Sequence, residues 1–221
     1  MPAKEYASDE VVIRYDPALC VHAAECMRGA PLVFDPDARP WIQPERGDPE
    51  HLAQVVRRCP TGALTLRFVD NRVAETPDAH NTATLAADGP IYLRGRIVYG
   101  GSGEHASIVE YTRIALCRCG ASRNKPFCDN SHRQASFSGG SHCSAPHKPL
   151  PGADDPQPCC GPVRVQPLPD GPLKVEGWVE FKAVDGSTYV AGAKCWLCRC
   201  GHSQTKPFCD GSHKRVGFIS D

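Results

Sequence analysis

The stretch CRCGASRNKPFCDNSH, residues 117–132, contains three cysteines and one histidine, and it recurs as CRCGHSQTKPFCDGSH at residues 198–213. Both copies keep the order Cys-x-Cys, Pro-Phe-Cys and Asp-x-Ser-His, with every ligand at the same spacing. Three thiols and one imidazole in one short segment supply the four ligands that a metal centre needs. Because two copies keep one register, chance is a poor explanation, and the sequence predicts two equivalent metal centres.

Composition limits the classes of protein to which the chain can belong. Its 221 residues carry 25 Lys and Arg against 25 Asp and Glu, so neither a nucleic acid nor an anionic membrane finds a cationic surface by default. No apolar run approaches the ~18 residues of a membrane span, and the N-terminal residues lack the apolar core of a signal peptide. We therefore expect a cytoplasmic, reducing location, in which 13 cysteines are natural as metal ligands rather than as disulfides.

An internal repeat organises the C-terminal two thirds of the chain. Asp88-Gly-Pro aligns with Asp170-Gly-Pro, and the cysteine motifs follow at matching distances. Runs rich in β-branched and aromatic residues predict strands at 91–99, 107–116, 173–181 and 188–197, with turns at 100–103 and 185–187.

The remaining segments complete the expected domain organisation. The N-terminal domain, residues 1–76, is predicted to hold strands at 11–15 and 64–68 and a helix at 48–58 that begins at Pro49. The first repeat covers 80–138, a Pro- and Gly-rich linker covers 139–162, and the second repeat covers 163–221. The predicted fold class is α+β, with an α/β N-terminal domain and two small β-rich modules.

The spacing inside the motif explains how its ligands can meet. Cysteines at positions i and i+2 project to one side of an extended segment, so Cys117 and Cys119 can reach one metal atom. Cys128 and His132 stand at i and i+4, which face the same way on a helical turn. The second copy offers the same donors: Cys198, Cys200, Cys209 and His213.

The residues around the third cysteine predict a local helix start. Asp129 is expected in the first turn, where an anion complements the helix dipole, and Ser131 is expected to satisfy a free amide nearby. Asn130 stands where the second copy has Gly211. If this position needs a positive φ, Gly is the easiest occupant and Asn is among the most tolerated alternatives.

These motifs resemble those of the CDGSH iron–sulfur family, also called NEET proteins, over residues 85–140 and 165–221. The resemblance implies a [2Fe–2S] cluster in each copy, with Cys117 and Cys119 on one iron and Cys128 and His132 on the other, and likewise in the second copy. It also implies that the two repeats pair as an intramolecular pseudo-dimer within a monomer, because single-motif members form two-fold dimers. The alternative is a zinc site with the same ligands, for which Cys-x-Cys is a short spacing.

A third cysteine set lies in the N-terminal domain, where Cys20, Cys26 and Cys59 resemble the ligands of the divergent single-cluster ferredoxin family. The matching segments are CVHAAEC at 20–26, VFD at 33–35, PWI at 40–42 and CPTGAL at 59–64. Ala23 occupies the position of the middle cysteine. Three thiolates favour a [3Fe–4S] cluster, whereas a [4Fe–4S] cluster would need His22, water or a small anion as its fourth ligand. A domain without a cluster is the third reading.

Four cysteines remain outside these sets. Cys195 takes the place of Ile114 in the alignment of the repeats, so we expect it to be an apolar packing residue. The others lie in the linker beside two histidines, where we expect a flexible segment rather than a further metal site: Cys143, Cys159, Cys160, His142 and His147.

The clusters determine the expected function, because the sequence shows no catalytic constellation and we do not expect an enzyme. The first hypothesis is one-electron transfer between redox partner proteins. The second is a cluster donor or a redox or pH sensor, since a histidine ligand binds metal only when neutral and titrates near physiological pH. An oxidoreductase with its own substrate pocket is the third. Partners are then redox proteins or cluster acceptors, without nucleic acid or membrane.

Overall fold

A computed structural model describes residues 2–100, 108–140, 150–152, 161–184 and 186–220. The chain divides into two compact units, Met1–Thr76 and Pro77–Asp221. The described ranges contain no helix that combines the length and the hydropathy of a membrane span.

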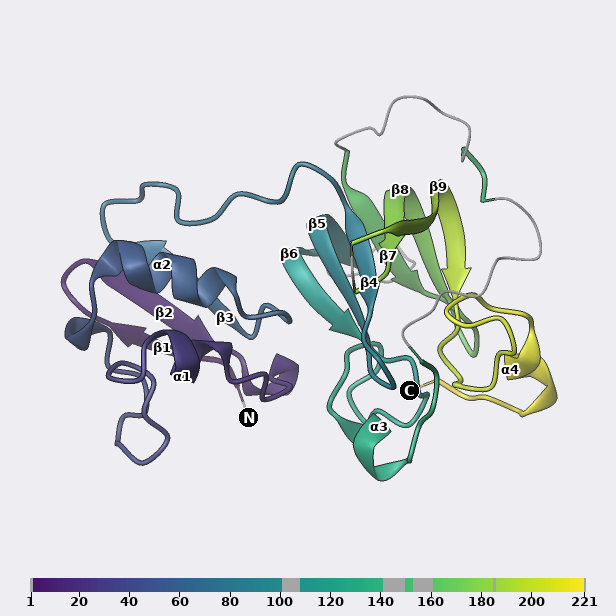
Figure 1. Ribbon diagram of the computed structural model, residues 1–221, viewed down its shortest axis with the longest axis horizontal. Coiled ribbons are helices and arrows are strands. Elements are labelled where there is room, and N and C mark those ends of the chain that lie inside the picture. The colour runs from purple at the N-terminus through teal and green to yellow at the C-terminus, as the bar shows by residue number, and fades with distance from the viewer. Residues whose placement is uncertain (1, 101–107, 141–149, 153–160, 185, 221) are drawn as a thin grey trace. The chain divides into compact units, whose positions relative to one another are not determined.

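The N-terminal unit is a three-stranded antiparallel sheet with a helix across one face (Figure 1). The strands follow the order β1 (Lys4–Ala7), β2 (Val11–Tyr15) and β3 (Leu64–Phe68). Helix α2 (Pro49–Arg57) begins as the sequence predicts, because Pro49 fits the first turn and the Asp48 carboxylate accepts a hydrogen bond from the His51 amide at 2.8 Å.

Between β2 and α2 the chain forms the irregular segment that holds two of the cysteines. It contains α1 (Glu25–Gly29) and the short 3₁₀ helices Pro17–Leu19 and Pro44–Arg46. Gly29 allows α1 to approach α2 closely, since a Cβ at this position would lie 2.8 Å from Val55. The buried core beneath this segment consists of Val11, Ile13, Ala30, Val33, Phe34, Ile42, Leu52, Val55, Val56, Leu64 and Phe68.

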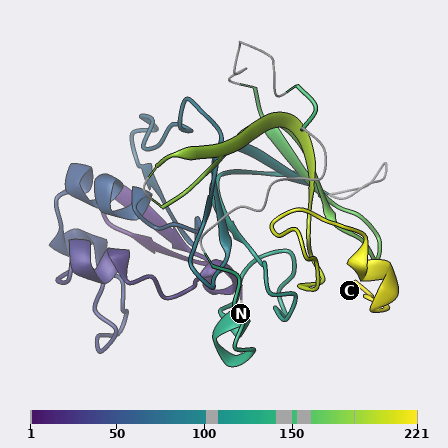
Figure 2. The same cartoon turned by 45° about the vertical axis from the view of Figure 1, so that its right-hand side comes forward.

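The C-terminal unit is built around one six-stranded sheet to which both repeats contribute. Its strands are β4 (Thr82–Leu85), β5 (Ile91–Gly100), β6 (Ile108–Leu116), β7 (Val163–Pro167), β8 (Leu173–Lys182) and β9 (Thr188–Leu197). The strands β6 and β9 lead directly into the cysteine motifs, whose loops carry the short helices α3 (Ser131–Gln134) and α4 (Ser212–Arg215). Both views show these loops at the same end of the sheet (Figures 1 and 2).

The two repeats exchange strand contacts within this sheet. β4 pairs antiparallel with β5 of its own repeat and parallel with β8 of the other, with Ala83 opposite Phe181. β7 has the equivalent pairings in the second repeat. It pairs antiparallel with β8 of its own repeat and parallel with β5 of the other, with Val98 opposite Arg164. Each pairing therefore has a counterpart in the other repeat, and both copies contribute to one continuous apolar core.

A bulge in each long strand allows this exchange. The register shifts between Arg94 and Ile97 in β5 and between Glu176 and Val179 in β8. Gly95 has a φ of +132° at this bend, and a Cβ there would lie 2.2 Å from the Asn81 Oδ1 atom. Glycine is required because the buried Asn81 side chain crosses at this point, where its amide donates to the Gly161 and Trp178 carbonyls at 3.0 and 3.1 Å.

The structure confirms the α+β class and the predicted main elements β2, β3, β5, β6, β8, β9 and α2. The short elements β1, β4, β7 and α1 were not predicted from the sequence, because their periodicity is weak. Residues 101–103 and 185 of the predicted turns lie outside the described residues, as do Cys143, Cys159, Cys160, His142 and His147. Cys195 is buried in the core as expected.

Candidate metal centres

Each cysteine motif folds back so that its third cysteine returns to the end of the preceding strand. In the first repeat, an isolated β-bridge joins Leu116 to Phe127, and the Cys128 amide donates to the Ala115 carbonyl at 2.9 Å. The Cys117 amide donates to the Pro126 carbonyl at 2.8 Å. The second repeat has the same bridge and the same bonds, at Leu197–Phe208, Cys209–Trp196 and Cys198–Pro207.

The serine of each motif holds this loop closed. Ser122 Oγ donates to the Phe127 carbonyl at 2.7 Å and accepts from the Asn124 amide at 3.0 Å. Ser203 makes the equivalent bond to the Phe208 carbonyl at 2.6 Å. Both serines are almost fully buried, so these hydrogen bonds satisfy polar groups that water does not reach.

The Cys-x-Cys pair presents two sulfurs at metal-binding separation. Cys117 Sγ lies 3.7 Å from Cys119 Sγ, and Cys198 Sγ lies 3.7 Å from Cys200 Sγ. Two thiolates about 2.3 Å from one tetrahedral metal ion stand roughly 3.7–3.8 Å apart, so each pair fits a single metal atom. The amide of Ala121 also donates to Cys119 Sγ at 3.4 Å, which stabilises a thiolate there.

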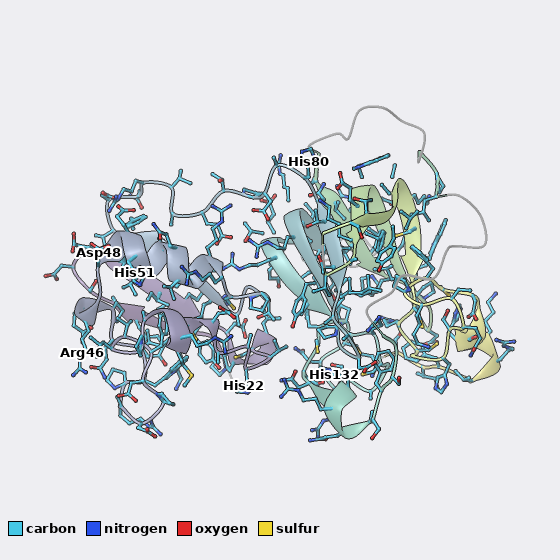
Figure 3. All side chains as sticks on the ribbon, in the orientation of Figure 1. His22, Arg46, Asp48, His51, His80 and His132 are labelled. Atoms are coloured by element: carbon cyan, nitrogen blue, oxygen red, sulfur yellow. The ribbon has the colours of Figure 1, made fainter. Side chains whose placement is uncertain are left out.

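The remaining cysteine and the histidine form a second donor pair in each loop. Cys128 Sγ lies 3.5 Å from His132 Nδ1, and Cys209 Sγ lies 3.3 Å from His213 Nδ1. The Nδ1 atom is thus the ring nitrogen beside the thiol; Figure 3 shows His132 on α3. Among the described residues, no three Cys, His, Asp or Glu side chains converge on one metal position, so the donors are arranged as pairs.

The local backbone differs from the single helical turn expected for this segment. Helix α3 begins only at Ser131, and Asn130 before it has a φ of +70°, so Cys128 and Asp129 are not helical. Asp129 lies just before the helix, and its carboxylate accepts from the Ser131 amide at 3.0 Å and the Arg123 amide at 2.9 Å. The expected positive φ is confirmed, since Gly211 has a φ of +85°.

Burial and hydrogen bonding set the protonation of the metal-free thiols. The hydrogen bond between Cys117 and Cys119 raises the pKa of Cys117 and lowers that of Cys119 to about 6. Burial raises the pKa of Cys128 to about 11, and it lowers the pKa of His132, to which the nearby Arg133 also contributes. Metal binding therefore has to displace protons from the buried thiols, while the imidazole is already biased toward its neutral, ligating form.

A buried arginine occupies the middle of each Cys-x-Cys. Arg118 is 1% exposed and Arg199 is 5% exposed. Arg118 Nε donates to the Gly89 carbonyl at 2.9 Å, and Arg199 Nε donates to the Gly171 carbonyl at 3.0 Å. These hydrogen bonds tie each cysteine loop to the Asp-Gly-Pro turn of its repeat and pair the buried guanidinium with backbone carbonyls.

The two cysteine loops contact each other through their backbones. A Cβ added to Gly120 would lie 2.3 Å from the Cys200 carbonyl oxygen, and a Cβ added to Gly201 would lie 2.1 Å from the Cys119 carbonyl oxygen. Both glycines have positive φ values, +77° and +80°. Only glycine fits this contact, which joins the Cys-x-Cys segment of one site to that of the other.

The three N-terminal cysteines lie around one cavity. Cys20, Cys26 and Cys59 line this small, predominantly apolar space of about 30 Å³, and Ala23 lines it at the position of the absent fourth thiol. His22 is exposed (Figure 3) and does not line the cavity. Both His22 and Ala24 adopt left-handed backbone conformations, with φ values of 53° and 60°. The three cysteines thus face a common space, whereas the imidazole lies outside it.

Tyr15 belongs to this site although the sequence reading did not select it. Burial and a hydrogen bond with Cys20 raise the pKa of Tyr15, so its hydroxyl stays protonated and donates toward the Cys20 sulfur. Trp41 packs edge-on against it at 4.9 Å between ring centroids. Four further residues of the repeats were not predicted as part of the sites: Arg118, Arg199, Gly120 and Gly201. The sequence offers one indication of their importance: Arg118 corresponds to Arg199 and Gly120 to Gly201, so both copies carry the same residue at each position.

Comparisons with known proteins match one family model to the N-terminal unit and another to the C-terminal unit. A family model described as a divergent 4Fe-4S mono-cluster matches residues 6–68, and one described as an iron-binding zinc finger of CDGSH type matches residues 88–133 and 170–214. The uncharacterized protein YjdI of Escherichia coli strain K12 is 32% identical over 62 residues, which cover 28% of this chain and 82% of that protein. YjdI of E. coli O157:H7 gives the same values. The chain is therefore an iron–sulfur protein that belongs to the divergent 4Fe–4S mono-cluster family and carries two CDGSH-type iron-binding repeats.

Proposed function

We propose that this protein transfers single electrons between redox partner proteins through three iron–sulfur clusters. The observation that carries the proposal is the backbone contact between the two Cys-x-Cys segments at Gly120 and Gly201. A contact between the ligand segments of two redox centres gives an electron a direct route from one to the other. The clusters supply the one-electron chemistry, and the protein sets their access and potential.

In each repeat the proposed cofactor is a [2Fe–2S] cluster. Cys117 and Cys119 would hold one iron, and Cys128 and His132 the other; in the second repeat the ligands are Cys198, Cys200, Cys209 and His213. The arrangement in pairs supports this assignment over zinc, because a mononuclear site needs all four donors around one atom. The proposed ring nitrogen is Nδ1 in both histidines.

In the N-terminal unit, which we take to be a ferredoxin-like domain, the proposed cofactor is a [3Fe–4S] cluster on Cys20, Cys26 and Cys59. The support is the cavity that these three cysteines share with Ala23 and without His22. A [4Fe–4S] cluster with His22 as its fourth ligand would need this loop to turn the imidazole inward. A water or small anion as the fourth ligand would need no such change.

We further propose that the repeats form an intramolecular pseudo-dimer and that the chain acts as a cytoplasmic monomer, without an enzymatic activity of its own. The support for the pairing is the reciprocal strand contact of β4 with β8 and of β7 with β5. Size-exclusion chromatography with light scattering tests it, since a monomer of 23.9 kDa is expected.

Metal analysis with electron paramagnetic resonance (EPR) tests the cofactors. The anaerobically purified protein should be red-brown and contain about four irons from the repeats and three from the N-terminal unit, with matching acid-labile sulfide. The oxidised [3Fe–4S] cluster should give an S = 1/2 EPR signal that Cys26→Ser abolishes. A colourless protein with stoichiometric zinc would contradict the assignment, and an EPR-silent oxidised N-terminal site with four irons would favour [4Fe–4S].

The second candidate function is donation of a labile cluster, or sensing through its loss. The specific observation is that His132 and His213 are only partly buried, so protons can compete for a ligating nitrogen. The two functions differ in a histidine-to-cysteine variant that retains its cluster. If the protein transfers electrons, such a variant should still reduce a c-type cytochrome, at a rate changed only by its altered reduction potential. If the protein donates its cluster, the variant should fail to mature an apo-ferredoxin.

A further inference from the structure

A groove of about 610 Å³ lies beside the three N-terminal cysteines. This volume is in the range of small-molecule binding sites, roughly 300–1,000 Å³. It is lined by residues of β1, β2 and the segment between β2 and α2, among them the cations Lys4 and Arg39 and the rings of Tyr6, Tyr15 and Trp41.

The groove shares a wall with the cavity that the three cysteines form. The residues common to both are Tyr15, Cys20, Ala24, Cys26 and Trp41. A molecule in the groove would therefore lie against two of the three proposed cluster ligands. It would also contact Ala24, which follows Ala23 at the position of the missing fourth cysteine.

The walls of the groove suit a planar aromatic molecule. Tyr6, Tyr15 and Trp41 contribute rings, and three prolines contribute rigid apolar surface. Tyr15 and Trp41 hold each other in an edge-on arrangement, with 78° between their ring planes, so their orientation is already fixed. Aromatic rings that are fixed in this way bind a planar ligand with little loss of side-chain entropy.

The charges of the groove select an anion. Its lining contains the cations Lys4 and Arg39 and no carboxylate. Within the described part of the chain neither cation has an ion-pair partner, and Arg39 Nη1 donates to the backbone carbonyls of Pro36 and Ala38 at 2.8 and 2.6 Å. The chain as a whole is neutral, so this absence of acidic residues is a local property.

We propose that the groove binds a planar aromatic anion, with its ring system between Tyr6 and Trp41 and its anionic group at Lys4 and Arg39. The ligand would lie beside the N-terminal cluster, which makes a redox-active aromatic molecule the relevant class if the proposed electron transfer is correct. Binding itself rests on the groove and not on that function.

Isothermal titration calorimetry with flavin mononucleotide and riboflavin tests the proposal on the full-length, cluster-loaded protein in the oxidised state. The two probes share one ring system and differ in the phosphate. Flavin mononucleotide should bind saturably and about tenfold more tightly than riboflavin. The double substitution Lys4→Gln with Arg39→Gln should remove that difference, while Arg46→Gln, an exposed cation outside the groove (Figure 3), should leave it unchanged.

Two further measurements locate the probe. Tyr6→Leu should weaken both flavins by about fivefold, because it removes a ring and keeps the apolar surface. Flavin mononucleotide should change the EPR signal of the N-terminal cluster and leave those of the reduced repeats unaltered. The proposal is overturned if flavin mononucleotide shows no saturable binding, if riboflavin binds equally well, or if the double variant binds like the wild type. Electron transfer can fail while binding persists, so the two proposals fail separately.

Discussion

The loops at 117–132 and 198–213 agree in their backbone contacts and differ in their exposed side chains. Both make the same β-bridge, the same amide-to-carbonyl bonds and the same amide-to-sulfur bonds, with closely matching distances. They differ at four positions: Ala121 against His202, Arg123 against Gln204, Asn124 against Thr205 and Asn130 against Gly211. The comparison shows that backbone geometry defines the donor set, while these side chains leave it unchanged.

The largest effect is expected from breaking the contact that joins the loops. Gly120→Ala and Gly201→Ala each combine a left-handed conformation with a clash against backbone, so each should lower the free energy of unfolding by about 2–5 kcal/mol. Both clusters should be lost together, which iron analysis of each variant would show. Gly217→Ala is the matched control, since its φ is +62° and a Cβ there meets nothing within 4 Å. A cost for Gly120→Ala no larger than this control would contradict the contact.

The second-largest effect is expected from the two buried arginines, whose replacement tests whether the two loops contribute equally to the free energy of unfolding. Arg118→Met and Arg199→Met should each cost about 2–4 kcal/mol, because buried carbonyl groups lose their donor. Chemical denaturation of the metal-free proteins measures these costs, with the exposed Arg133→Met as control. Costs that differ by more than about 1 kcal/mol would show that equal geometry conceals unequal stability.

The histidines define a pH test of the same comparison. Burial lowers the pKa of His132, so in the metal-free protein the unfolded chain takes up the proton first as the pH falls. The free energy of unfolding should therefore decrease below a pH of about 6.5, and His132→Gln should weaken this dependence.

In the loaded protein, His132→Cys and His213→Cys should slow the acid-induced loss of visible absorbance and lower the reduction potential of their own cluster. The reason is that a thiolate adds negative charge and replaces the imidazole. Stopped-flow absorbance after a drop to about pH 5.5 measures the rate. Wild-type rates in both variants would show that the imidazoles are not ligands.

A smaller effect contrasts the N-terminal site with the repeats. There the Tyr15 hydroxyl hydrogen-bonds with Cys20 in addition to the backbone amide bonds at Cys26, whereas the repeats use backbone amides. Tyr15→Phe should lower the potential of the N-terminal cluster by about 20–60 mV, the equivalent of one hydrogen bond for one electron. Redox titration by EPR would detect it. An unchanged potential would mean that the hydroxyl does not contact the loaded site.

The smallest effect is expected where the loops differ by one side chain. Asn130→Gly removes a Cβ from a residue with a φ of +70°, and Gly211→Asn adds one at +85° in open space. Each should change the free energy of unfolding by at most about 1 kcal/mol, with opposite signs. Thermal unfolding of the two variants measures this. Loss of iron from either would show that this position does more than turn the backbone.

The sequence predicted what is encoded locally. The strands β5, β6, β8 and β9 have clear β-rich runs, and each motif carries all of its ligands in one short segment. The strands β4 and β7 were missed because so short a strand gains its stability from partners far away in the chain, here β8 and β5. Tyr15 was missed for the same reason, since nothing adjacent to it in sequence indicates that it lies beside Cys20.

The sharing of strands between repeats has a consequence for biosynthesis. When His132 emerges from the ribosome, the first motif is complete in sequence, but β4 still lacks its partner β8, which ends at Lys182. At about 5–20 residues per second, the interval lasts several seconds. During that time the first set of cysteines is exposed on an unfinished sheet without the Cys200–Gly201 backbone against Gly120. We therefore expect the first centre to be assembled only after β8 and the Cys200–Gly201 segment have been synthesised.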